Sequence, residues 1–210
     1  MLKTNLLFIF IIIFSIFLSG CSNTSELESV VDPAYTEKVE SILVMFRTGD
    51  VKITKEVETS IVDNLKKKNV DSYASYRLIP LTRQYSQEEF NEKVSNVIVE
   101  KNIDSILFVT VKNIKTDKHE INTHNQNSGN AVSSFVQGYA QGLDNSQYET
   151  LEMNIDIRLY NTKKDGIAWR GTISGTSSNF TSDTGKENII SIMEKSAKKL
   201  VDNLSKNNLI

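Results

Sequence analysis

Residues 151–159 constrain the fold strongly, because apolar and polar side chains alternate there without a break. Leu, Met and Ile occupy every second position, with Glu, Asn, Asp and Arg between them. A period of two predicts a strand with one face on the core and one in water. Asp165-Gly166 then gives a turn signal. The apolar residues that continue the pattern beyond the turn are Ile167, Trp169 and Ile173. We therefore predict an antiparallel hairpin that buries these three side chains.

The preceding part of the chain alternates apolar runs with helical patterns. Three apolar runs predict strands, at residues 41–47, 70–79 and 103–114. The helical patterns between them cover residues 54–69 and 86–101, and the apolar side chains of each fall on one face. Strands separated by single helices are typical of parallel strands joined by crossovers.

A last helical pattern at residues 187–207 completes the element order β-α-β-α-β-β-β-α. This order predicts an α/β fold, a single domain over residues 39–210 with helices packed on a mixed sheet. The length of 210 residues suits one such domain. The formal net charge of −2 provides no basic field, so nucleic acid is not expected as a partner.

The N-terminal region has the pattern of a targeting signal rather than of part of the folded domain. Residues 6–18 are apolar except for Ser15, and Lys3 precedes them. As a helix this run would span about 20 Å, which is less than the roughly 30 Å of a bilayer core. Such a run has the length of the apolar region of a signal peptide. We predict that residues 1–20 are a signal peptide that is removed.

Cys21 is the predicted lipid attachment site. The run Leu18-Ser19-Gly20-Cys21 resembles a bacterial lipobox, in which small residues admit the signal peptidase and the thiol accepts diacylglycerol. Cys21 is the only cysteine, so no internal disulfide can form, and lipidation explains an otherwise odd thiol in an exported chain. Resemblance to bacterial lipoproteins implies further fatty acylation, with palmitate as the expected acyl chain, and a stable anchor. The alternative is an anchor helix with an incidental cysteine.

Residues 21–38 are polar and acidic, and they predict a lipidated tether that holds the domain off the bilayer. Ser22, rather than Asp, follows the cysteine. In a Gram-negative host, resemblance to known lipoprotein sorting implies the outer membrane, with the domain in the periplasm.

Residues 122–147 are rich in Asn, Ser, Gly and Gln, and such a long connection is uncommon inside a compact domain. The segment is either a structureless hairpin extension or a flap that binds a partner or touches the membrane. The candidate contact residues of a flap are Phe135, Val136, Tyr139 and Leu143.

Familiar catalytic and metal motifs are missing from the sequence. The two histidines, His119 and His124, are five residues apart, so on a helix they would point about 140° apart and could not share a zinc ion. Gly185-Lys186 lacks the spacing of a phosphate-binding loop, and no G-x-S-x-G occurs. We expect no catalytic residues, no metal and no cofactor.

The C-terminal third carries a family resemblance. Its residues are Leu159-Tyr160-Asn161 before the turn, Ala168-Trp169-Arg170-Gly171-Thr172 after it, Leu200-Val201-Asp202-Asn203-Leu204, and Asn208-Leu209-Ile210. They resemble a poorly characterised family of bacterial lipoproteins, in which a hairpin with a Trp strand precedes a terminal helix. The element order is also similar to the fold of the curli-secretion lipoprotein, the lipoprotein activator of penicillin-binding protein and the TolB amino-terminal domain. Resemblance at this level implies fold, not function.

These observations predict a membrane-anchored envelope lipoprotein that acts as a non-enzymatic binding or assembly module. Its expected partners are the membrane, through Cys21, and an envelope protein or cell-wall component. A subunit of an oligomeric export or pore assembly is one alternative, implied by resemblance to the curli-secretion lipoprotein. An unrecognised hydrolase is another.

Overall fold

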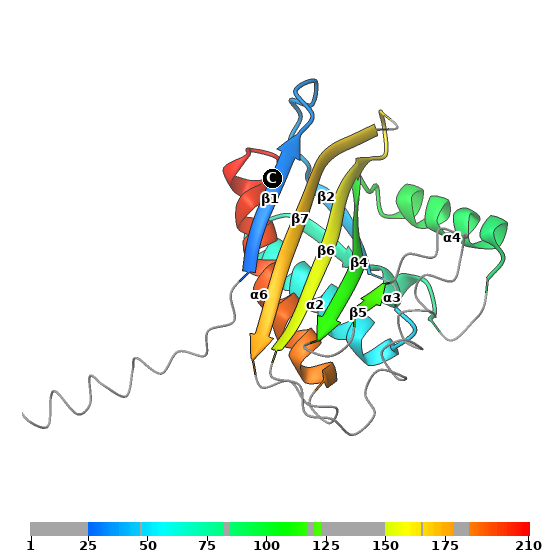
Figure 1. The fold of residues 1–210 in the computed structure, drawn as a ribbon. Coiled ribbons are helices and arrows are strands. Elements are labelled where there is room, and N and C mark those ends of the chain that lie inside the picture. The colour runs from blue at the N-terminus through cyan, green and yellow to red at the C-terminus, as the bar shows by residue number, and fades with distance from the viewer. Residues whose placement is uncertain are drawn as a thin grey trace, which may run out of the picture.

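The computed structural model describes residues 25–46, 48–81, 85–116, 120–122, 150–164, 166–178 and 185–210. In these residues seven strands form one mixed sheet in the order β1-β7-β6-β4-β2-β3, with β5 added to β4 (Figure 1). The strands are β1 (Ser25–Val31), β2 (Ser41–Phe46), β3 (Asp71–Ala74), β4 (Ser105–Thr116), β5 (Glu120–Asn122), β6 (Thr150–Asn161) and β7 (Gly166–Ser178). The described helices are α2 (Val51–Lys66), α3 (Ser75–Leu78), α4 (Gln87–Glu100) and α6 (Gly185–Lys206). The predicted α/β fold is confirmed.

The sheet has a parallel and an antiparallel part. Strand β2 runs parallel to both β3 and β4, as expected for strands joined through helices. The strands β4, β6, β7 and β1 are antiparallel neighbours. The predicted antiparallel hairpin is therefore confirmed as β6 and β7.

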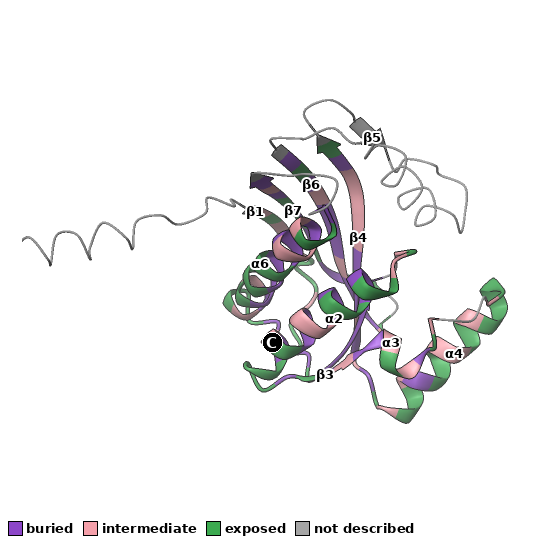
Figure 2. Cartoon of the chain, turned by 90° about the horizontal axis from the view of Figure 1, so that it is seen from below, coloured by how far each residue is buried: buried purple, intermediate pink, exposed green. Residues whose placement is uncertain are grey.

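Helices α2 and α6 pack on one face of the sheet, and the main core lies between them and the strands (Figure 2). The odd-numbered residues of β6 from 151 to 159 are all at most 1% exposed. Helix α4 packs on the opposite face near β2 and β4, where Met45, Val97 and Ile103 belong to a second, smaller cluster. The rest of that opposite face, over β1, β7, β6 and β4, has no described helix on it.

Helix α2 begins at Val51, three residues before the predicted start, because Asp50 caps it. The Asp50 carboxylate accepts hydrogen bonds from the backbone N–H groups of Lys52, at 2.8 Å, and Ile53, at 3.1 Å. Helix α4 begins with a capping box between Ser86 and Glu89.

The predicted tether is wrong for residues 25–31, which form strand β1. This strand pairs with β7 from Ser25↔Gly175 to Val31↔Trp169. Leu27 and Val31 pack against the main core, whereas Glu26, Glu28 and Val30 point away. The hydroxyl of Ser29 donates to the Asn203 side chain of α6, at 3.1 Å. The folded domain thus begins at Ser25 rather than at residue 39.

Two further expectations are corrected. The strand expected at residues 70–79 ends at Ala74, because the Ser75 hydroxyl and the Tyr76 N–H both donate to the buried carboxylate of Glu58 and turn the chain into α3. Trp169 and Ile173 are fully buried as predicted, but Ile167 is 39% exposed. A register shift beside Ala168 moves Ile167 out of the buried row.

Candidate functional site

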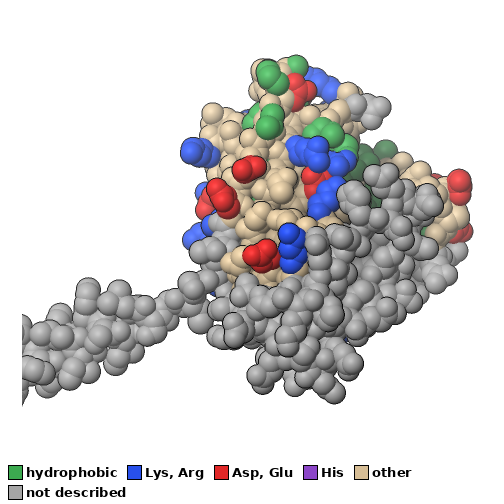
Figure 3. Space-filling view, in the orientation of Figure 1, with side chains coloured by type: hydrophobic (Ala, Val, Ile, Leu, Met, Phe, Trp, Pro, Cys, Tyr) green, Lys and Arg blue, Asp and Glu red, His purple; other side chains and the backbone are tan. Residues whose placement is uncertain are grey.

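The open face is the exposed side of β1, β7, β6 and β4, opposite α2 and α6. We define it by Val30, Phe108, Lys112, Asp156, Arg158, Ile167 and Arg170. The pairing of the strands brings Phe108, Arg158, Arg170 and Val30 together as one cross-strand row. Figure 3 shows this side, where basic side chains gather around a carboxylate with hydrophobic side chains next to them. Register, rather than sequence proximity, thus assembles the open face.

Asp156 is the centre of this face. Although it points away from α2 and α6, its side chain is only 5% exposed, since basic side chains cover it. Arg158 Nε lies 2.9 Å from Oδ2, and Arg170 Nη2 lies 2.9 Å from Oδ1. Arg170 Nε donates to the same Oδ1 at 3.0 Å, which makes a fork. Lys112 Nζ is more distant, at 3.9 Å. Three positive charges therefore surround one negative charge.

Arg158 is further held by Tyr160, whose hydroxyl accepts a hydrogen bond from Nη1 at 3.3 Å. This hydrogen bond and the charge of Asp156 both raise the pKa of Arg158, so its guanidinium stays charged. The side chains of Arg158, Lys112 and Arg170 are still 33%, 40% and 54% exposed. They can therefore meet an incoming anion without a rearrangement of the sheet.

Apolar side chains border the charged cluster. Phe108 is 38% exposed, Ile167 39% and Val30 73%. Arginine and aromatic side chains are enriched in protein interfaces, whereas scattered lysines and glutamates are typical of the remaining surface. The arrangement can bind carboxylates through charge-assisted hydrogen bonds and can bury apolar side chains beside them.

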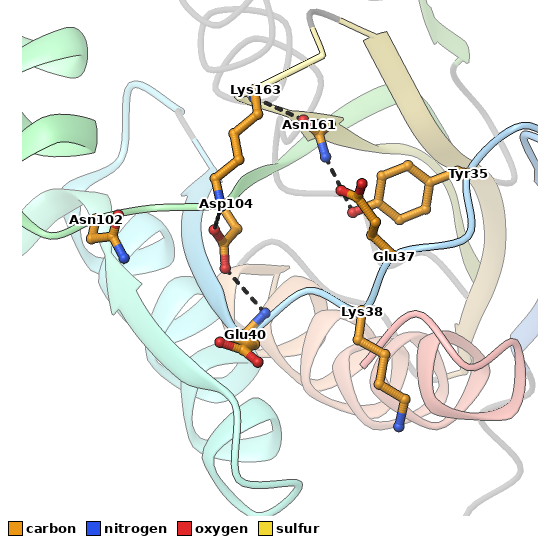
Figure 4. Close-up of a pocket in the computed structure, with 8 residues that line it drawn as sticks. All are labelled: Tyr35, Glu37, Lys38, Glu40, Asn102, Asp104, Asn161 and Lys163. Atoms are coloured by element: carbon orange, nitrogen blue, oxygen red, sulfur yellow. Dashed lines mark hydrogen bonds and ion pairs between the residues drawn. The ribbon is translucent and has the colours of Figure 1, made fainter.

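A polar pocket of about 420 Å³ lies at one end of the sheet, where β4 begins and β6 ends (Figure 4). Its lining residues are Tyr35, Glu37, Lys38, Glu40, Asn102, Asp104, Asn161 and Lys163. Asp104 forms an ion pair with Lys163, at 2.7 Å, and accepts the N–H of Glu40, at 3.3 Å. Asn161 donates to the Tyr35 hydroxyl at 3.2 Å.

These contacts fasten loops to the sheet. Burial raises the pKa of Asp104, but the Lys163 ammonium and the Glu40 and Ser41 N–H groups outweigh it and hold the pKa below its usual value. Asp104 is thus a fixed anion and a poor proton acceptor near neutral pH. Asn161 Oδ1 also accepts from the N–H groups of Lys163 and Lys164, both at 2.7 Å, which shapes the turn after β6. We assign a structural role to this pocket.

Glu58, on α2, forms a second buried polar cluster that the sequence reasoning did not identify. It is 0% exposed and accepts from Phe46 N–H at 2.8 Å, Ser75 Oγ at 2.7 Å and Tyr76 N–H at 2.9 Å. Burial raises the pKa of Glu58 in spite of these hydrogen bonds. A signal was present in the sequence, since Glu58 is one turn from Thr54 and Ile61 on the buried side of the helix. The cluster joins α2 to the end of β2 and to α3.

The residues that the sequence marks for function lie outside the described part of the chain. They are Leu18, Ser19, Gly20 and Cys21 of the lipobox, and Phe135, Val136, Tyr139 and Leu143 of the candidate flap. Their roles remain predictions. Within the described ranges, no helix combines the length and apolarity needed to cross a membrane. The same residues contain no group of three or more His, Cys, Asp or Glu able to hold a metal ion.

Comparison with known proteins gives structural neighbours only. No family model matches the chain, and no curated protein matches it. A PelC dodecamer from Paraburkholderia phytofirmans is similar with a TM-score of 0.43 and 12% identity, over 84% of this chain and 97% of that one. A minor lipoprotein from Acinetobacter baumannii is similar with a TM-score of 0.39 and 9% identity, over 81% and 96%. The chain is thus similar to PelC and to a bacterial lipoprotein at low identity, a likeness that carries no information on function.

Proposed function

We propose that this chain is a lipid-anchored protein of the bacterial envelope whose domain binds another envelope protein through the open face. The lipobox that ends at Cys21 supports the anchor. The observation that carries the binding role is the Asp156 cluster, bordered by exposed apolar side chains. With Ser22 after the cysteine, we place the protein at the outer membrane of a Gram-negative host, facing the periplasm.

The open face contributes little to the stability of the fold. Exposed ion pairs contribute about 0–1 kcal/mol each to the free energy of folding. For a covered carboxylate, the cost of desolvation cancels much of the favourable energy of its ion pairs. Phe108, Ile167 and Val30 also leave apolar area in water, on a single side of the sheet. Charged and apolar groups that contribute little to folding are better explained by a partner.

The charge of the open face indicates the chemistry of that partner. Around Asp156, three cations for one carboxylate leave a local positive surplus, whereas Glu26 and Glu28 lie further along β1 on the same side of the sheet. The Arg170 side chain is 54% exposed, so its guanidinium reaches solvent. A guanidinium fork binds a carboxylate with two hydrogen bonds. We therefore propose a protein segment that presents Asp or Glu side chains next to apolar ones.

We propose no enzymatic activity. The two carboxyl groups with altered surroundings described above are already engaged, Asp104 by Lys163 and Glu58 by three donors. A general acid or base needs a proton-transfer position that faces a substrate. Neither group offers one, because Glu58 is fully buried and Asp104 is held as an anion.

The test is photocrosslinking in intact host cells with the full-length chain. A photoreactive residue replaces Val30 on the open face in one variant and Val99 on α4, which is 81% exposed, in the control. We expect a discrete adduct with a second protein from position 30 and none from position 99. Arg170→Gln should weaken the adduct, and Cys21→Ser should lower its yield by removing the tether. Equal adducts from both positions, or none from position 30, would contradict the proposal.

The same experiment tests two other readings. An adduct that contains two copies of this chain would favour the oligomeric export or pore assembly. Deletion of residues 123–149 tests the candidate flap, since loss of the adduct with an unchanged melting temperature would move the contact to Phe135, Val136, Tyr139 and Leu143.

A further inference from the structure

The connection between the predicted lipid and the folded domain is very short. Residues 22–24 alone separate Cys21 from Ser25, the first residue of β1. A fully extended chain advances at most about 3.6 Å per residue, so the four steps from Cys21 to Ser25 reach no further than about 14 Å. The tether expected at residues 21–38 would have allowed about 60 Å by the same rule.

Ser25 is not itself at the end of a loose strand. It pairs with Gly175 of β7, and the ladder continues through Val31↔Trp169. Gly175 in turn packs closely on α6, since an added Cβ there would lie 2.4 Å from Ile192. The start of β1 is thus fixed to the body of the domain. The domain as a whole must therefore sit so that Ser25 is within about 14 Å of Cys21.

The elements at this end of the sheet form what we call the anchor end: the start of β1 and the first turns of α2 and α6. The two helices meet here through ion pairs, Lys186–Asp50 at 2.6 Å and Lys52–Glu187 at 3.4 Å. Figure 1 shows the start of β1 and the start of α6 toward the same end of the sheet. A lipid on Cys21 therefore brings these turns to the bilayer.

We propose that the domain stands end-on upon the membrane, with the anchor end against the lipid headgroups. The inference rests on the proposed lipidation of Cys21. The chemistry of this end suits headgroups, because Lys52 and Glu187 are about 60% exposed and charges of both signs are paired. Val51, 41% exposed, adds one apolar side chain at the same place. No insertion into hydrocarbon is required.

This orientation decides what the other surfaces face. Val30 lies five residues along β1 from Ser25, which is about 17 Å further from the lipid, and Arg170 of β7 is paired with it. The open face then points sideways, toward neighbours on the same membrane. The polar pocket lies at the start of β4, whereas β4 ends on the side of the anchor end. A strand of 12 residues spans about 40 Å, so the pocket is remote from the membrane.

The test measures the distance of two sites from the lipid surface. Val51→Cys marks the anchor end, and Val99→Cys, near the start of β4, is its matched control. The introduced thiol is the only one available for a donor dye, because lipidation consumes the sulfur of Cys21. The full lipidated chain is reconstituted in vesicles of phosphatidylethanolamine and phosphatidylglycerol with an acceptor dye on the headgroups.

We expect energy transfer to be several-fold greater from position 51 than from position 99. Equal transfer, or greater transfer from position 99, in vesicle-bound protein would overturn the end-on orientation while leaving the anchor intact. Protein that does not stay on the vesicles would overturn the lipid anchor itself, and the orientation with it.

A second variant tests the cause. A Gly/Ser linker of about 15 residues inserted after Ser22 has a mean reach of about 20 Å and frees the domain. Vesicle binding should be unchanged, but the difference between the two positions should shrink. A difference of undiminished size would show that the short connection does not set the orientation.

Discussion

The two faces of strand β6 lie in different environments, one in the core and one on the open face. Its odd-numbered residues, from Leu151 to Leu159, are buried against α2 and α6. Asp156 and Arg158 alternate with them and belong to the open face. Because successive side chains of a strand point to opposite sides, one segment serves both faces. The contrast teaches that β6 contributes to stability mainly through one side of the sheet, which leaves its other side available for the binding role that we propose.

The largest effect is expected on the covered face. Ile155→Ala removes a fully buried side chain and should lower the free energy of unfolding by about 2–5 kcal/mol. Urea unfolding followed by the fluorescence of Trp169, the only tryptophan, measures this loss. A loss below about 1 kcal/mol would show that the contrast between the faces is overstated.

Glu58→Ala should cost about 3 kcal/mol, because it leaves three buried donors without an acceptor. The donors belong to Phe46, Ser75 and Tyr76. The same unfolding measurement applies, and Glu56→Ala, an exposed neighbour on α2, is the control that should change little. If both variants lose equally, helix propensity and not the hydrogen bonds explains the effect.

The dependence of stability on pH should have opposite signs at Glu58 and Asp104. The pKa of Glu58 is raised by burial, so its stabilisation is complete below its usual pKa of about 4.5 and declines as the pH rises through the folded value. Burial acts in the same direction on Asp104, but its hydrogen bonds win and lower the pKa, so its stabilisation is present above 3.8 and is lost as the pH falls.

Unfolding of Glu58→Gln and Asp104→Asn from pH 3 upward, each compared with the unmodified chain, measures these trends; the pH range brackets ordinary carboxyl pKa values of about 4. We expect the advantage of Glu58 over Gln to shrink with rising pH and that of Asp104 over Asn to grow. Parallel trends would refute the assignment.

On the open face, Asp156→Asn should cost about 1 kcal/mol or less, because Arg158 and Arg170 are partly exposed and water can take the place of the carboxylate. The loss should also shrink in high salt, which already screens the pairs. A cost equal to that of Ile155→Ala would make the cluster a structural element and weaken the proposal of a binding face.

The smallest effect on stability is expected for Val30→Glu and its matched control Val99→Glu. Both side chains are more than 70% exposed, so each change should stay within about 0.5 kcal/mol. With a photoreactive residue at position 108, only Val30→Glu should remove the adduct, because it places a carboxylate where an acidic partner binds. Loss of the adduct in both variants would point to an indirect effect.

Local patterns predicted the elements whose evidence is local. The alternation at residues 151–159 predicted β6, and the spacing of Ser86 and Glu89 agrees with the capping box of α4. Strand β1 was missed, although Leu27, Ser29 and Val31 alternate with outward side chains, because its partners on β7 are 138 to 150 residues later in the chain. Its acidic flanks therefore predicted a tether.

The open face depends on register, which a single sequence does not specify. That polar residues of β6 face water was predictable. That Arg170 and Lys112 meet Asp156 was not, because these residues come from β7 and from an irregular position in β4, where the pairing shifts between Val111 and Asn113. Ile167 was placed on the buried face for the same reason. The signal peptide and lipobox at residues 1–21 were recognised from local spacing, and they stay a prediction.

The pairing of β1 with β7, the first and last of the described strands, has a consequence for the export that we propose. An exported chain would present the residues of β1 early, but their partners, residues 169–175, would follow only after most of the remaining domain. In the proposed lipoprotein, processing and acylation at Cys21 would therefore precede the pairing of β1, and completion of the domain would bring the acylated residue close to the edge of the sheet.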